Sequence, residues 1–90
     1  MFDVSAVREQ FPVFGKTLPK GYPVTYLDTA ASAQKPRVVI DAERYVCEDH
    51  YANAYRGVYR FGAQIDEELE ASREAVRRLI GAESTDEIAF

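Results

Sequence analysis

The feature that most constrains the fold is an apolar repeat with helical spacing in the last third of the chain. Acidic residues fill the first turns of this repeat and Arg77 and Arg78 its last, as the helix dipole favours. Gly81 follows directly, where a left-handed residue commonly ends a helix. We therefore predict a helix over residues 64–80, with Leu69 and Val76 most deeply buried. Its predicted apolar face comprises Ile65, Leu69, Ser72, Val76, Leu79 and Ile80.

A second amphipathic helix is predicted over residues 36–51. Pro36 suits its first position, because the N–H that proline lacks has no partner there. The apolar stripe of this helix consists of Val39, Ala42, Val46 and His50. A short helix over residues 4–10 should precede it, capped by Asp3 and stopped by Pro12.

Two short segments have strand character, residues 24–27 and residues 87–90. Neither is long enough to build a sheet from this chain alone. The predicted fold class is therefore mainly α with short strand stubs, without a domain boundary inside residues 1–90. Amphipathic helices with isolated strand stubs indicate a piece of a larger fold.

Composition excludes several classes of function. The net charge of −4 argues against nucleic-acid binding, which normally needs a basic face. Arginines near the end of the third helix alternate with glutamates, and Glu74 should pair with Arg78 four residues later. The single cysteine excludes an internal disulfide, and no apolar segment approaches the length that spans a bilayer. We expect a cytoplasmic protein that contacts neither nucleic acid nor membrane.

Few side chains could carry chemistry. His50 is the only histidine, and we expect it to contact free carbonyls at a helix end. Cys47 lies within a helix and is expected to be packed rather than nucleophilic. Arg56, in an aromatic and glycine-rich loop over residues 51–62, could clamp a carboxylate or phosphate through two parallel bonds. No catalytic, cofactor-binding or metal-binding residue is predicted within this chain.

Two segments carry a family resemblance. The first is Tyr26-Leu27-Asp28-Thr29-Ala30-Ala31-Ser32-Ala33-Gln34-Lys35-Pro36, and the second is Asn53-Ala54-Tyr55-Arg56-Gly57-Val58-Tyr59-Arg60. In this order and spacing they resemble the amino-terminal part of the class V aminotransferase family. The nearest branch is the SUF-type, group II cysteine desulfurases, which feed iron–sulfur cluster assembly. The resemblance runs over residues 2–90 and covers about the first quarter of such an enzyme.

The resemblance implies a fold-type I, α/β enzyme that depends on pyridoxal phosphate. Such an enzyme converts L-cysteine to L-alanine and leaves a persulfide on an enzyme cysteine, from which a sulfur-acceptor protein takes the sulfur. The family's aldimine lysine and catalytic cysteine lie beyond residue 90. We therefore expect no cofactor on this chain by itself, and no activity. The remaining part of the enzyme and a second copy of the chain, in a homodimer, are its expected partners.

The resemblance also implies four substrate-binding residues. Ala30 and Ala31 would lie beside the bound amino acid, and Tyr55 and Arg56 would reach the site from the neighbouring subunit. Tyr55 and Tyr59 stand where the nearest branch usually has histidines. These departures leave the exact subfamily open. Two alternatives are kept: another class V enzyme, such as a selenocysteine lyase or an epimerase, and a non-catalytic helical fragment that self-associates.

Overall fold

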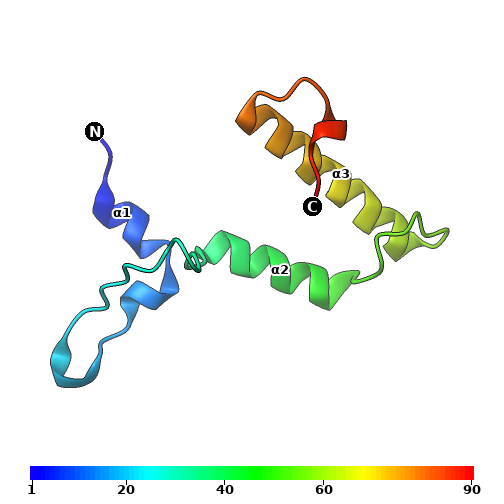
Figure 1. Cartoon of the computed structure of the whole chain (residues 1–90). Coiled ribbons are helices and arrows are strands. Elements are labelled where there is room, and N and C mark those ends of the chain that lie inside the picture. The colour runs from blue at the N-terminus through cyan, green and yellow to red at the C-terminus, as the bar shows by residue number, and fades with distance from the viewer. The chain divides into compact units, whose positions relative to one another are not determined.

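The computed structural model describes all 90 residues and consists of helices and turns without a β-sheet. Figure 1 shows the α-helices in chain order: α1 (Val4–Glu9), α2 (Arg37–Asp49) and α3 (Arg60–Ile80). Short 3₁₀ helices occupy the connections: η1 (Pro12–Gly15), η2 (Pro19–Gly21) and η3 (Thr85–Glu87). The chain forms two compact units, Met1–Tyr45 and Val46–Phe90, and each is described by itself.

In the first unit, side-chain and backbone caps set the helix ends. The Asp3 carboxylate accepts a hydrogen bond from the Ala6 N–H at 3.1 Å, which confirms the predicted cap of α1. The Arg37 N–H donates to the Gln10 carbonyl at 2.7 Å, so the start of α2 is tied to the end of α1. Between these helices, aromatic side chains of η1 and its cap are in contact, and the Arg8 guanidinium lies 4.3 Å from the ring centre of Phe14.

The predicted strand stubs are wrong. Residues 24–27 have no regular structure, and residues 87–90 contain the end of η3 followed by an irregular segment. A strand requires a partner that pairs with its backbone groups, and this chain supplies none to either segment. Instead, arginine side chains donate hydrogen bonds to one backbone carbonyl in each segment. The Val24 carbonyl accepts a hydrogen bond from Arg8, and the Ile88 carbonyl accepts one from Arg73.

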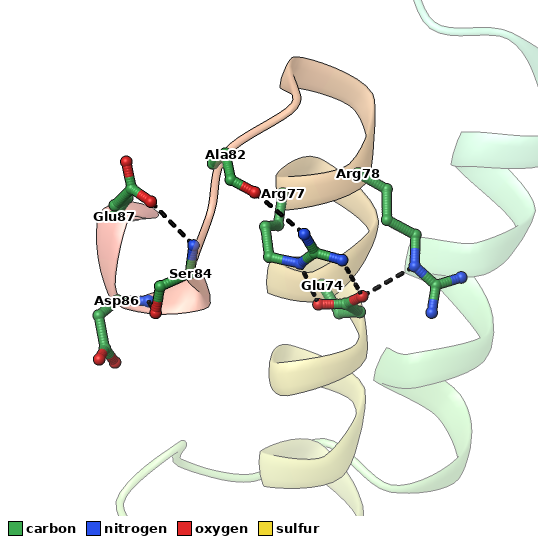
Figure 2. A network of polar contacts seen from close by, with 7 residues as sticks. All are labelled: Glu74, Arg77, Arg78, Ala82, Ser84, Asp86 and Glu87. Atoms are coloured by element: carbon green, nitrogen blue, oxygen red, sulfur yellow. Dashed lines mark hydrogen bonds and ion pairs between the residues drawn. The ribbon is translucent and has the colours of Figure 1, made fainter.

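The end of α3 carries a compact ion-pair network (Figure 2). Glu74 accepts hydrogen bonds from the Arg77 guanidinium at 2.7 and 2.8 Å and from Arg78 at 2.8 Å. The predicted Glu74–Arg78 pair is thus confirmed. Arg77 also donates to the Ala82 carbonyl at 2.9 Å, beyond the helix end. These bonds hold the pKa of Glu74 at about 2, with Arg77 as the larger cause and Arg78 as the smaller.

Beyond α3, the chain turns and runs back along the helix (Figure 1). A capping box begins η3: the Ser84 hydroxyl accepts from the Asp86 N–H, and the Glu87 carboxylate accepts from the Ser84 N–H. The Arg73 guanidinium then lies 5.0 Å from the centre of the Phe90 ring. Ile88 follows η3 and is 6% exposed, which makes it the only buried apolar side chain of the structure.

Gly81 ends α3 in the left-handed conformation, with φ 72°, as predicted. Its N–H donates to the Arg77 carbonyl. A Cβ added at Gly81 would meet no atom within 4 Å, but alanine disfavours the left-handed backbone conformation. Gly81→Ala should therefore destabilise the chain by about 1–2 kcal/mol. Urea unfolding followed by circular dichroism measures this, with Gly15→Ala as control, because Gly15 has an ordinary φ and open space around it. An equal loss in both variants would contradict the assignment.

Burial of the helix faces is lower than predicted. Leu69 and Val76 are only half-buried, and Leu79 is 85% exposed. On α2, Val39 and Cys47 are exposed rather than packed. The periodicity of each helix is correct, but the exposed fractions show that water reaches much of these faces. α3 also begins one turn earlier than predicted, at Arg60.

Candidate functional site

The loop between α2 and α3 carries two of the four predicted site residues, Tyr55 and Arg56. Tyr55 is 86% exposed and Arg56 is also exposed. Arg56 adopts a left-handed backbone with φ 50°, which is uncommon for a residue with a side chain. The ion pairs of this unit use His50 and the arginines of α3, and Arg56 takes part in none of them. Its guanidinium is therefore available to an anionic ligand.

One end of this loop is held by a buried histidine. The His50 side chain is 1% exposed and lies between two carboxylates: its Nε2 is 2.9 Å from Glu68 of α3, and its Nδ1 is 3.0 Å from Asp49. Gln64 also donates to Glu68, at 3.4 Å. We call His50, Asp49 and Glu68 the His50 clamp. The prediction that His50 contacts helix-end carbonyls is wrong, because both ring nitrogens face carboxylates.

The electrostatics of the His50 clamp favour a charged imidazole. Carboxylate oxygens only accept hydrogen bonds, so satisfying both partners requires a proton on each ring nitrogen. The bond to Glu68 raises the pKa of His50 above 6.5, partly offset by burial, and Asp49 raises it further. The same bond lowers the pKa of Glu68 below 4.5, with burial opposing and Gln64 assisting. The clamp is therefore an ion pair at pH values between the lowered pKa of Glu68 and the raised pKa of His50.

These shifts predict a pH window for the stability of the second unit. The contribution of His50 is complete below pH 6.5 and is lost as pH rises through its raised folded pKa. The contribution of Glu68 is present above pH 4.5 and is lost as pH falls through its lowered folded pKa, and Glu74 adds an acid-side loss toward pH 2. Unfolding midpoints should therefore peak between pH 4.5 and 6.5. A midpoint that rises steadily from pH 6 to 9 would contradict the ion pair.

Ala30 and Ala31, the other two predicted site residues, lie exposed on a turn of the first unit. Backbone groups close this turn, since the Asp28 carbonyl accepts from the N–H groups of Ala31 and Ser32, each at 3.1 Å. The Tyr26 hydroxyl donates to the Ser32 carbonyl at 2.5 Å and supports the turn from one side. The turn thus presents small side chains on a hydrogen-bonded backbone, which leaves room for a ligand to approach closely.

A hollow of about 320 Å³ lies beside this turn. It is mostly apolar, and its lining residues are Phe11, Phe14, Tyr26, Thr29, Ala33, Gln34 and Pro36. Ala30 and Ala31 do not line it, although their neighbours Thr29 and Ala33 do. Sequence reasoning missed the aromatic part of this wall, because Phe11 and Phe14 are distant from the turn along the chain.

The residues of this chain do not by themselves fit pyridoxal phosphate. That cofactor needs a lysine in a pocket, with an acidic partner for its ring nitrogen. Lys16, Lys20 and Lys35 are all exposed, and the Lys35 ammonium donates to the Ala33 carbonyl at 3.1 Å. No lysine lines the hollow. No group of three or more acidic, histidine or cysteine side chains has an arrangement that could hold a metal ion. None of the helices combines the length and apolar composition needed to cross a bilayer.

The comparisons with known proteins agree with each other. The family model for class V aminotransferases matches residues 25–90. Among curated proteins, a cysteine desulfurase of Serratia proteamaculans (strain 568) is 43% identical over 89 residues, which is 99% of this chain. A cysteine desulfurase of Yersinia pestis (strain Pestoides F) is 42% identical over the same length. The chain spans 22% of the length of each of these relatives.

Proposed function

This chain belongs to the class V aminotransferase family, and from that premise we propose that it is the amino-terminal segment of a pyridoxal phosphate-dependent cysteine desulfurase. The observation that carries the proposal is the similarity of 99% of the chain to proteins named cysteine desulfurase. The proposed reaction takes L-cysteine to L-alanine and leaves the sulfur on an enzyme cysteine as a persulfide. A sulfur-acceptor protein would carry it to iron–sulfur clusters in the cytoplasm.

Arg56 is the residue of this chain that we propose to bind substrate, through the carboxylate of the amino acid. Three observations support this role: the guanidinium is exposed, it has no ion-pair partner in its unit, and it lies on a left-handed backbone. A guanidinium can hold a carboxylate by two parallel N–H···O bonds, which fixes orientation as well as affinity. Tyr55 would line the same site. Ala30 and Ala31 would leave room for the substrate beside their turn.

The rest of the enzyme would supply what this chain lacks. We propose a fold-type I architecture in which the remaining part carries the cofactor lysine and the catalytic cysteine, and the 90-residue chain is inactive by itself. When bound, pyridoxal phosphate provides the electron sink for bond cleavage at the amino acid. The exposed apolar side chains of α2 and α3, such as Val38, Tyr45, Leu79 and Ile80, support contacts with that remaining part and with a second subunit.

The test uses the full-length enzyme that contains this segment. Incubated with L-cysteine and pyridoxal phosphate, it should form L-alanine and a thiol-reducible persulfide in equal amounts. Alanine released from selenocysteine alone, or racemised substrate without alanine, would replace the proposal by one of the other class V activities. Arg56→Ala should lower kcat/KM for L-cysteine by about 100-fold through misplacement of the substrate. Arg60→Ala, an exposed arginine at the start of α3, is the matched control and should change it little.

A further inference from the structure

The loop that carries Arg56 touches α3 backbone to backbone. A Cβ atom added at Gly62 would lie 2.9 Å from the Cα of Gly57 and 3.5 Å from its N and C atoms. In the reverse direction, a Cβ added at Gly57 would lie 3.0 Å from the Cα of Gly62 and 3.4 Å from the Tyr59 ring. Gly62 is also the only buried residue of α3. The contact therefore exists only because both positions lack a side chain.

Helix formation does not explain glycine at position 62. Within a helix glycine is less favourable than alanine, because it loses more backbone freedom on folding. Gly62 lies in the first turn of α3 and adopts an ordinary negative φ, so its backbone conformation is open to any residue. The obstacle to alanine is steric. Its Cβ would collide with the Gly57 backbone, and backbone atoms cannot rotate away as a side chain can.

We propose that Gly62 is a positioning residue for Arg56: it admits the Gly57 backbone onto α3 and so sets where the guanidinium meets the substrate carboxylate. This inference rests on the proposed function of Arg56. Gly57 follows Arg56 directly, and the strained φ of 50° leaves Arg56 little freedom to compensate when its neighbour moves. A guanidinium that holds a carboxylate by two parallel hydrogen bonds loses much of its affinity when it shifts by about 1 Å. Gly62 itself touches no reacting atom.

The test is Gly62→Ala in the full-length enzyme, with steady-state kinetics and hydrogen exchange over residues 51–59. The proposal expects KM for L-cysteine to rise about tenfold while kcat stays within about threefold, because ground-state and transition-state binding fall together. Exchange over residues 51–59 should quicken. Gly15→Ala, the same change where no atom lies within 4 Å, should leave both readouts unaltered. An unchanged KM in Gly62→Ala, or a fall in kcat alone, would overturn the positioning role.

Two further variants keep the result interpretable. Gly57→Ala meets a milder obstruction, partly from the movable Tyr59 ring, so its rise in KM should be smaller and in the same direction. Loss of the cofactor absorbance would reveal that Gly62→Ala does not fold. In that case Gly57→Ala becomes the deciding variant, and an unchanged KM in Gly57→Ala would overturn the proposal. Arg56→Ala separates the two proposals. If it leaves KM unaltered, the role of Arg56 fails, and with it the inference. If it raises KM and the glycine variants do not, only the inference fails.

Discussion

Ile88→Ala should destabilise the chain by about 2–5 kcal/mol, the cost typical of truncating a buried isoleucine. Ile88 is the only apolar side chain that the structure buries, and the Arg73 bond to its carbonyl holds the segment against α3. Removing its side chain therefore takes away the one apolar group that the chain shields almost completely from water. Urea unfolding of the 90-residue chain, followed by circular dichroism, measures the loss.

The chain offers a matched control for this change. Ile80, at the end of α3, is 63% exposed. Ile80→Ala makes the same chemical change in the same unit and should alter stability by about 0.5 kcal/mol or less. Equal losses in the two variants would show that Ile88 is not packed as described.

His50→Ala should produce the second large effect. It removes the one large side chain that is fully buried, and it leaves the carboxylates of Asp49 and Glu68 near each other without a cation between them. Like charges that lose a shared cation repel, and the space left by the ring adds a cavity. The unfolding midpoint should fall at pH 6, and amide exchange across the loop after α2 should quicken. Cys47→Ala, at an exposed position of α2, should alter neither the unfolding midpoint nor the amide exchange.

His50→Gln distinguishes the charge of the clamp from its shape. Glutamine can donate a hydrogen bond to Glu68 but does not titrate, so part of the stability should remain. The decline in stability above pH 6.5 should disappear, because that decline comes from deprotonation of His50. The acid-side decline should persist through Glu74, whose pKa is held at about 2. A His50→Gln chain that keeps the alkaline decline would show that another group is responsible.

Local interactions were predictable from the sequence and tertiary ones were not. The Asp3 cap, the Gly81 end of α3 and the Glu74–Arg78 pair involve residues at most four positions apart, and the structure has all of them. The His50 clamp was missed, because His50 and Glu68 lie 18 residues apart and neither signals the other along the chain. The Gly57–Gly62 contact was missed for a different reason: a glycine in an irregular loop and a second glycine in the first turn of the following helix do not reveal that their backbones touch.

The sequence by itself determined the order and periodicity of the helices, their caps, and the segments that resemble class V aminotransferases, because these depend on local backbone preferences and on residue order. Only the tertiary structure decided which side chains are buried and whether the strand-like segments pair. Burial and strand pairing both require a second segment in contact with the first. Within these 90 residues Ile88 and His50 are buried, whereas the apolar faces of α2 and α3 stay largely exposed and residues 24–27 form no strand.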